Sequence, residues 1–317
     1  MQQARIVTVT SNPALDRATS APHVTAGPKL RCLAPRVDPG GGGINAARVV
    51  RLLGGYATVV TTLGGATGQR LGELLTAAGL AARVVPISGE TRESLTVDDT
   101  STSEQYRFVM PGPTLAPDEV EQLIDTAVDQ VLPGTIVVAS GSLSVGAPHD
   151  TWAELARRAT ARGGRVILDT SGPAAQAALG SGIEVLRCND REMAALIGRP
   201  LDDPETQERE LRRLVDEGAA KVFVMGLGAE GSLVVSADEI LRVPAPSLPM
   251  RSAVGAGDSL VGAFTLGLAR GWTLGDAATF GVVAAAAAHT TPGTELCRRE
   301  DVERLFEEAT GRPIPTD

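Results

Sequence analysis

The stretch that decides the fold is Gly255-Ala-Gly-Asp-Ser-Leu-Val-Gly-Ala-Phe264, in which small residues lead directly into an apolar run. The glycines mark the beginning of a helix, and the amides of its first turn have no partner within that helix. These amides and the helix dipole favour an anion. Asp258 lies in this first turn, where it could take a proton from a hydroxyl while the amides hold phosphoryl oxygens. An Asp that only complements the helix dipole fits the pattern equally well.

Outward from this stretch, strands and helices alternate along the chain, which predicts an α/β fold with a mostly parallel sheet covered on both faces. The hydrophobic pattern predicts strands at 5–10, 57–63, 135–139, 165–169, 183–187 and 221–225, and a β-ribbon at 231–243. It predicts helices at 45–53, from the glycine-rich turn at 64–68 to residue 78, and at 117–131, 149–162, 190–198, 204–217, 256–270, 274–289 and 299–309. Two β pieces, at about 16–38 and 91–110, fall outside the alternation and would form a small lid sheet over the site. With no linker or repeat, we expect 1–317 to be a single domain.

Composition excludes several classes of protein. The 317 residues are 43% hydrophobic and 21% charged, which suits one large globular domain or two smaller ones. The net charge of −9 argues against nonspecific nucleic-acid binding. The uncharged run 277–294 is too rich in alanine for a membrane span and predicts a packed core helix. Residues 1–20 have no signal-peptide pattern, so we expect a soluble cytoplasmic protein. The three cysteines are far apart, which argues against a disulfide framework or a structural zinc site.

A second glycine motif, Gly226-Leu-Gly-Ala-Glu-Gly231, matches the GxGxxG pattern of dinucleotide-binding sites. That fingerprint requires a following helix whose N-terminus receives the pyrophosphate. The residues that follow here, 232–236, are typical of a strand. We therefore favour a glycine turn in a hairpin, which could still line a nucleotide pocket, over a dehydrogenase. The sequence contains no GxxxxGK(S/T), which excludes a Walker-type P-loop.

Asparagine occurs only at Asn12, Asn45 and Asn189, and such sparing use suggests positions where an amide is needed. Asn189 and Glu192 open a helix with capping-box spacing, which is the favoured interpretation. The same pair could hold water ligands of Mg²⁺, which prefers oxygen. Asn45 follows the run Gly40–Gly43, where the backbone can approach a ligand closely and the amide could bind a sugar hydroxyl. A flexible turn before a helix is the alternative.

Asp16 follows the first predicted strand, at the edge where open α/β sheets place their ligands. It could bind two hydroxyl groups, or it could be a solvated turn acid. The histidines at 23, 149 and 289 show no ligand spacing, so we interpret them as structural or surface residues.

Taken together, the glycine run with Asn45, the Asn189-x-x-Glu192 element and the Gly255–Asp258 loop resemble the signature regions of the PfkB-type, ribokinase-like sugar kinases. The order and spacing match over nearly the whole chain. Four stretches are similar to the bacterial 6-phosphofructokinases of that family: Lys29–Cys32, Asp38–Asn45, Gln105–Gly112 and Ser140–Leu143. The resemblance implies a three-layer α/β/α core with a lid sheet. It also implies ATP-dependent phosphorylation of fructose 6-phosphate at the 1-hydroxyl.

The resemblance further implies a role for each matching residue. Asp258 would be the general base, and the anion hole would consist of Gly255, Ala256 and Gly257. The sugar hydroxyls would be bound by Asp16, Gly41 and Asn45, and the substrate's phosphate by Lys29 and Arg92. The nucleotide-binding residues would be Arg187, Asn189, Gly226, Gly228 and Gly231. Mg²⁺ would be supported by Asn189 and Glu192, and a monovalent cation such as K⁺ by Ser252, Val254 and Gly293.

The sequence also departs from the family pattern. It has Arg187-Cys-Asn189 where these enzymes usually have Lys-Pro-Asn, and Gly226 where they usually have Ser; Thr291 and Glu295 differ near the cation site. The resemblance implies a homodimer through the lid sheets, with Arg92 able to reach across the interface. The alternatives are a related kinase of fructose 1-phosphate, tagatose 6-phosphate or an unphosphorylated sugar, and a catalytically weak nucleotide-binding regulatory homologue.

Overall fold

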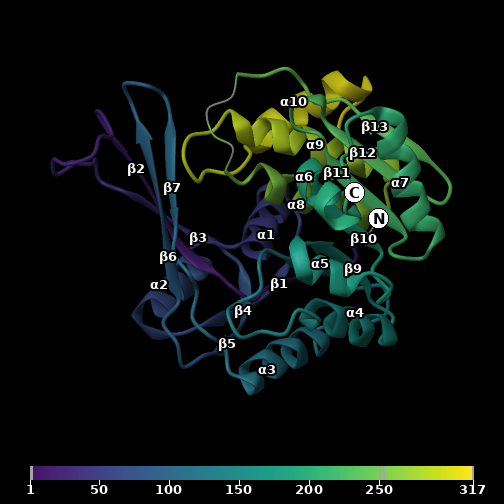
Figure 1. Ribbon diagram of the computed structural model, residues 1–317, viewed down its shortest axis with the longest axis horizontal. Helices are drawn as coiled ribbons and strands as arrows, with labels where there is room; N and C mark the ends of the chain where they lie inside the picture. The colour runs from purple at the N-terminus through teal and green to yellow at the C-terminus, as the bar shows by residue number, and fades with distance from the viewer. Residues whose placement is uncertain (1–2, 250–251, 253, 316–317) are drawn as a thin grey trace.

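The computed structural model describes residues 3–249, 252 and 254–315, and within them a nine-stranded sheet forms the centre of the molecule (Figure 1). Its order is β13 (Ile240–Val243), β12 (Ser232–Ser236), β11 (Val222–Gly226), β10 (Val185–Asn189), β9 (Arg165–Asp169), β8 (Ile136–Ser140), β1 (Ile6–Thr10), β4 (Thr58–Leu63) and β5 (Ala81–Pro86). All neighbours from β11 to β5 pair in parallel, and β12 and β13 pair antiparallel at one edge. The predicted α/β fold with a mostly parallel sheet is confirmed.

The central strands are buried on both faces, as expected for a parallel sheet between two layers of helices. In β1, Val7 and Val9 face one core while Ile6 faces the other. The first core is covered by α3 (Pro117–Val128), α4 (Thr151–Ala161), α5 (Gly172–Ala178), α6 (Asp190–Ile197) and α7 (Pro204–Asp216). The opposite face is covered by α1 (Gly42–Leu52), α2 (Gly65–Ala77), α8 (Ala256–Ala269), α9 (Leu274–His289) and α10 (Arg299–Thr310). Figure 1 shows α3 and α4 on one side of the sheet and α8 to α10 on the other.

A second sheet of four strands stands to one side of the main sheet (Figure 1). Its order is β3 (Arg36–Gly40), β2 (Ala14–Ala21), β6 (Arg92–Asp99) and β7 (Gln105–Val109). These strands come from the two segments that the sequence assigned to a lid, so the separate sheet is confirmed. The pairing of Ala14 with Arg92 begins β2 two residues earlier than predicted, and the residues from 22 to 35 form a largely exposed loop rather than a strand.

Sequence patterns missed two elements and misplaced a third. The edge strand β5 buries only Val85, so it carries no alternating pattern, and α5 is a short Ala-rich helix without a clear apolar stripe. Helix α1 begins at Gly42 rather than at Asn45, because Gly41 turns the chain with φ +117° immediately before it. The glycine run is therefore partly helical.

The alanine-rich segment forms α9, which packs along α8, the helix that follows Gly255, and holds it in place. The predicted core helix is confirmed as far as His289. Phe280 lies at the centre of this packing, with its ring 5.1 Å from that of Trp272 and 5.8 Å from that of Phe306. Among the helices that the structure describes, none has the length and apolarity needed to cross a bilayer.

Replacing Phe280 by Ala should lower the free energy of unfolding by about 3–5 kcal/mol, because it leaves a cavity where a fully buried ring packs. Replacing Tyr56, an aromatic residue that is 73% exposed, should cost less than about 1 kcal/mol. Urea unfolding of both variants measures the difference. Equal losses would show that the α8–α9 contact does not depend on this ring.

Candidate functional site

A cavity of about 180 Å³ lies between the lid sheet and the beginning of α8. We call it the lid cavity. It brings together several of the predicted residues, namely Asp16, Gly41, Asn45, Arg92, Gly255 and Asp258. It lies beyond the carboxyl end of β1, the edge at which open α/β sheets bind their ligands. Residues far apart in the sequence thus share one small concave space.

Asp258 and Asn45 are in direct contact inside the lid cavity. The Nδ2 of Asn45 donates a hydrogen bond of 2.8 Å to Oδ2 of Asp258. Burial among packed protein atoms raises the pKa of Asp258 to about 6, and the negative charge of Asp169 adds to this effect, whereas the Asn45 hydrogen bond and Arg187 oppose it. A carboxyl group with a pKa near neutrality is suited to accept and release a proton.

Asp16 lies on β2 and is a second carboxyl group with a raised pKa in the same cavity. Burial raises its pKa to about 6, and the positive charges of Arg92 and Arg48 only partly offset that effect. Arg92 donates through Nη2 to the carbonyl of Asn12 at 3.1 Å, while its Nε is buried without a described partner. Its guanidinium therefore retains capacity to bind a ligand.

The beginning of α8 has the geometry of an anion site. Gly255 precedes the helix in the left-handed region, with φ +75°, and none of the described side chains caps the helix. The first-turn amides are therefore available to a ligand. A Cβ at Gly257 would lie 2.8 Å from Nη1 of Arg187, so the guanidinium of Arg187 lies directly beside the first turn. Helix amides and an arginine converge here.

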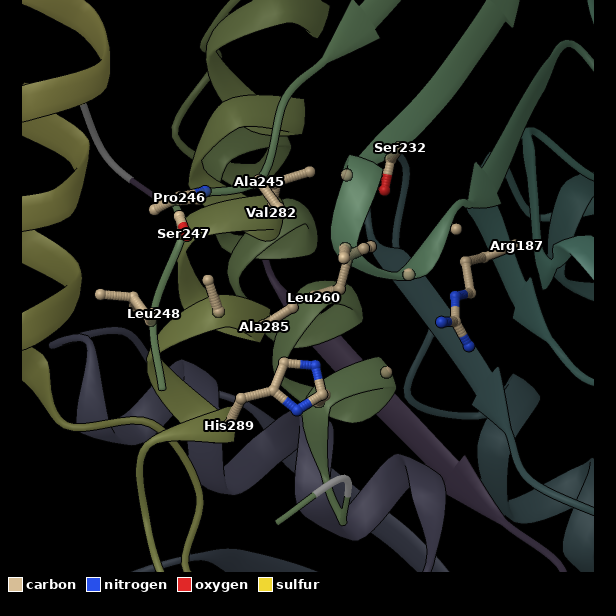
Figure 2. Close-up of a pocket in the computed structure, with 17 residues that line it drawn as sticks. Arg187, Ser232, Ala245, Pro246, Ser247, Leu248, Leu260, Val282, Ala285 and His289 are labelled. Carbon is tan, nitrogen blue, oxygen red and sulfur yellow. The ribbon is translucent and has the colours of Figure 1, made fainter. Parts of the chain in front are cut away.

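A second cavity, of about 310 Å³, lies on the other side of the α8 N-terminus, and we call it the hairpin cavity (Figure 2). Gly226, Gly228 and Gly231 line one wall, and the rest is largely apolar. Figure 2 shows Arg187 at one end of this space and His289 near the beginning of α8. Its lining suits a mostly apolar group next to a charged one.

The glycine motif of this wall is a hairpin turn. β11 and β12 pair antiparallel, and only a 3₁₀ turn, Gly228–Glu230, joins them. Because no α-helix follows the glycines, this turn offers no helix N-terminus to a pyrophosphate. The predicted hairpin is confirmed and the dehydrogenase interpretation is wrong.

Asn189 and Glu192 form the predicted capping box. The backbone amide of Glu192 donates to Oδ1 of Asn189 at 2.8 Å, and the amide of Asn189 donates to Oε2 of Glu192 at 2.9 Å. Glu192 also lines a third cavity, of about 370 Å³, together with Asp169 and Arg187. Arg187 and Asp169 form an ion pair of 3.1 Å at this boundary. The capping box thus places oxygen atoms at the edge of the site.

Lys29 and two residues of the predicted cation site, Ser252 and Gly293, lie outside these cavities, whereas Val254 lines the lid cavity. Lys29 is exposed in the loop between β2 and β3 and does not line the lid cavity. Ser252 and Gly293 are joined by a hydrogen bond of 3.0 Å from Ser252 Oγ to the Gly293 carbonyl, and the amide of Val254 donates to the same Oγ at 3.1 Å. The three residues of the predicted cation site therefore do come together.

Sequence reasoning missed several residues that line the cavities. Arg107 faces the lid cavity from β7, and the alternation of the hairpin strand was an available signal for it. Asp169 ends the apolar strand β9 at the ligand edge of the sheet, so the reasoning applied to Asp16 could have found it. His289 lines the hairpin cavity from the end of α9 rather than serving only a structural role, and nothing local in the sequence marks it.

Comparison with known proteins identifies the family. The profile of the pfkB family carbohydrate kinases matches residues 10–301. The ATP-dependent 6-phosphofructokinase isozyme 2 of Mycobacterium tuberculosis is 44% identical over 96% of this chain and 89% of its own length. That of Escherichia coli is 42% identical over 95% of this chain and 98% of its own. The chain belongs to the pfkB family of carbohydrate kinases.

Solved structures agree with this family assignment. The E. coli phosphofructokinase-2, solved in complex with substrates and products, superposes with a TM-score of 0.93 at 41% identity, covering 97% of this chain and all (100%) of that one. The same E. coli protein has been solved in complex with potassium and in a tetrameric inhibited form. Arabidopsis thaliana ribokinase, at 19% identity, has a TM-score of 0.73 over 96% of this chain and 99% of that one, which confirms the ribokinase-like fold alone.

The oxygen donors that could hold Mg²⁺ in this pfkB kinase lie at the edge of the site. Within the described residues, no group of three or more His, Cys, Asp or Glu side chains could hold a metal directly. Asn189 and Glu192 bond to each other in the capping box, and Asp169 is paired with Arg187. This donor set fits an ion that keeps most of its water ligands, as Mg²⁺ does, and does not fit one that needs a closed protein cage.

The raised pKa of Asp258 predicts a stability effect. Because this pKa is raised to about 6 in the folded protein, the folded state binds the proton more tightly than the unfolded state does. The charged carboxylate therefore destabilises the kinase above about pH 6, and the effect disappears as the pH falls below about 4. Asp258→Asn should raise the free energy of unfolding by about 1–2 kcal/mol at about pH 7.5, a value discounted for the opening of the cavity to solvent.

The gain should vanish when unfolding is measured near pH 4. Asp202→Asn, at an exposed loop position, is the matched control and should show no such pH-dependent gain. An Asp258→Asn variant that is as stable as wild type at neutral pH, or less stable, would contradict the raised pKa of Asp258.

Proposed function

We propose that this kinase transfers the γ-phosphoryl group of ATP to the 1-hydroxyl of fructose 6-phosphate, with Asp258 as the general base. The observation that carries the proposal is the position of the Asp258 carboxylate, which lies in the lid cavity beside the free amides at the beginning of α8. Identity above 40% over nearly the whole length of two 6-phosphofructokinases supports this choice of substrate.

The chain's own residues account for the chemistry. Asp258 accepts the proton of the 1-hydroxyl as its oxygen attacks the phosphoryl group, and a pKa near 6 leaves it ionised at neutral pH. The amides of Gly255, Ala256 and Gly257 donate to the transferring phosphoryl oxygens, where negative charge accumulates. Asp16 and Asn45, with the close backbone at Gly41, orient the sugar hydroxyls. Positioning and fixed dipoles thus supply most of the catalysis.

The substrate's own phosphate requires positive charge inside the lid cavity. Arg92 and Arg107 both line it, and the unpartnered Nε of Arg92 supports assigning the phosphate to that residue. Lys29 lies in the exposed loop, so it would reach the phosphate when that loop folds over the cavity or when it comes from a partner subunit. Two arginines and an Asp with a raised pKa suit an anionic sugar.

The nucleotide would occupy the hairpin cavity. Its apolar wall suits the base, and Arg187 lies next to the α8 amides that would receive the phosphates. Gly226, Gly228 and Gly231 let the backbone approach the nucleotide closely, and Asn189 lies beyond Arg187 at the end of β10. The guanidinium of Arg187 binds phosphate through a planar fork, and it keeps a positive charge where the family pattern usually has lysine.

Cations would complete the site. Asn189 and Glu192 would hold the water ligands of Mg²⁺, which when bound supplies positive charge to the phosphate oxygens of ATP. Ser252, Val254 and Gly293 come together near the beginning of α8, which supports a K⁺ site like that implied by the potassium complex of the E. coli enzyme.

We further propose a homodimer formed through the lid sheets. Phe108, Val109 and Met110 at the end of β7 are 47%, 63% and 45% exposed, an unusual density of apolar residues for a solvated strand. Leu33 in the neighbouring loop is 69% exposed. Pairing two lids would cover these side chains and would bring the phosphate site of each subunit close to the interface.

The test is the release of ADP from MgATP with fructose 6-phosphate, tagatose 6-phosphate, fructose 1-phosphate and fructose. We expect turnover to be highest with fructose 6-phosphate. Asp258→Asn should lower kcat by about 10²- to 10⁴-fold, the range for loss of a positioned base. The unfolding measurements described above show whether this variant is folded.

Other outcomes of the ADP-release assay would change the substrate assignment, the function or the role of Asp258. A preference for another phosphosugar would move the substrate assignment and keep the mechanism. ATP binding without turnover on any of the four sugars would favour a regulatory homologue. An Asp258→Asn variant with near-normal kcat would remove Asp258 from the role of base.

Arg92→Ala should raise KM for fructose 6-phosphate by about 10- to 100-fold, because one charge-assisted contact to the phosphate is lost. KM for fructose, which has no phosphate, should change little. Arg83→Ala, on the exposed edge strand β5, is the control and should leave both constants unchanged. An equal rise in KM for both sugars would show that Arg92 does not bind the phosphate.

A further inference from the structure

Arg48, on α1, makes three hydrogen bonds from one buried guanidinium. Its Nη1 donates to Oδ1 of Asn45 at 3.0 Å and to the carbonyl of Pro39 at 3.1 Å. Its Nη2 donates to Oδ1 of Asp38 at 2.9 Å. Only 13% of the Arg48 side chain is exposed. The residue is one helical turn beyond Asn45, so the two side chains lie on the same face of α1.

This contact decides which way the Asn45 amide points. A guanidinium can only donate hydrogen bonds, so the atom of Asn45 that faces Arg48 must be the carbonyl oxygen. The NH₂ group must then face the other way, and there it donates to Oδ2 of Asp258 at 2.8 Å. Without Arg48, the amide could rotate and present its oxygen to the carboxylate.

Arg48 is itself fixed in place. Asp38, on β3, is held by Arg36 through Nε at 2.6 Å and by the Thr294 hydroxyl at 2.8 Å. The Asp38 carboxylate in turn accepts from Arg48. Arg36, Asp38 and Thr294 therefore form a frame that leaves the guanidinium of Arg48 little freedom to turn away from Asn45.

Arg48 does not line the lid cavity, so it is not placed to touch the sugar. It borders a different cavity of about 440 Å³, which we call the rear cavity and which is also lined by Arg51 and Arg298. Arg51 lies on α1, one turn further along, and is exposed. None of the contacts described for it involves Asn45, so it serves as a matched control.

We propose that Arg48 is the positioning residue that orients the Asn45 amide toward Asp258. The proposal deepens the proposed function, because it explains how the base is kept paired with a donor. It assigns a role to a residue that contacts neither the sugar space nor the nucleotide space. Rotation of the amide would place an oxygen against the carboxylate and would favour its protonated form.

The direction of the effect follows from the groups around Asp258. Asn45 and Arg48 face it from α1, Asp16 from β2, Asp169 from β9 and Arg187 from β10. The Asn45 donor lowers the pKa of Asp258, so its loss should raise that pKa further. The protonated form would then persist to higher pH, and less base would be available at neutral pH.

The first readout does not require activity. Carbon-13 NMR of the Asp carboxyl groups follows the titration of Asp258, whose signal is assigned by its absence in Asp258→Asn. We expect the titration midpoint to rise by about one pH unit in Arg48→Ala and to stay unchanged in Arg51→Ala. The acid limb of kcat/KM should shift by the same amount, and because about half of Asp258 would then be protonated at pH 7, kcat/KM should fall by about twofold there and by more at lower pH.

Two further measurements separate positioning from a loss of charge or of fold. Arg48→Lys keeps the charge, but one ammonium cannot bridge Asp38 and Asn45 as the fork does, so the titration midpoint should rise here too. Guanidinium ion should reach the space left in Arg48→Ala through the rear cavity and return both readouts toward wild type. It should have no such effect on Arg51→Ala. If Arg48→Ala fails to fold, Arg48→Lys decides the question.

The outcomes are distinguishable. An Asp258 titration that is unchanged in both Arg48 variants overturns the inference, even if the wild type is an active phosphofructokinase. A shifted titration in a protein that phosphorylates none of the four sugars supports the inference and overturns the proposed function. Equal shifts in Arg48→Ala and Arg51→Ala would show a general charge effect of the rear cavity and would also overturn it.

Discussion

The hydrogen bond between the Asn45 amide and the Asp258 carboxylate joins helices whose residues lie 213 positions apart in the sequence. It requires α1 and α8 to pack very closely. A Cβ at Gly262 would lie 2.7 Å from the carbonyl oxygen of Ala46, so a larger residue would push the helices apart. The lid cavity, the anion site at Gly255 and the raised pKa of Asp258 all depend on this close approach of two helices on one face of the sheet.

Burial gives the site its electrostatic character. Asp16 and Asp258 both have their pKa raised to about 6, because packed protein excludes water from the cavity that they share. The positive charge of Arg92 lowers the pKa of Asp16, and that of Arg187 lowers the pKa of Asp258, but each offsets the effect of burial only in part. Such a site costs folding stability at neutral pH, and in return it holds acceptors and donors in fixed positions before the reactants arrive. The same exclusion of water makes every dipole at the α8 N-terminus more effective.

The two cavities on either side of the α8 N-terminus differ in the polarity of their linings. The lid cavity is polar and is lined by carboxylates and arginines, whereas the hairpin cavity is largely apolar. The first turn of α8 is common to both, and Arg187 lies beside it. A group transferred from one cavity to the other would pass these amides. Of the three asparagines in the chain, Asn45 lines the lid cavity, Asn12 accepts a hydrogen bond from Arg92 of that cavity, and Asn189 caps the helix after β10.

The sequence alone determined the α/β fold, the separate lid sheet, the hairpin at the glycine motif and the capping box of Asn189, because each depends on local periodicity, turn residues or residue spacing. It also singled out Asp258 by its place in a glycine-rich first turn. Only the tertiary structure decided that Asn45 faces Asp258, that His289 borders the hairpin cavity and that Arg48 orients the amide. These contacts join elements distant in sequence, and side-chain burial, which sets their charge states, exists only once the helices are packed on the sheet.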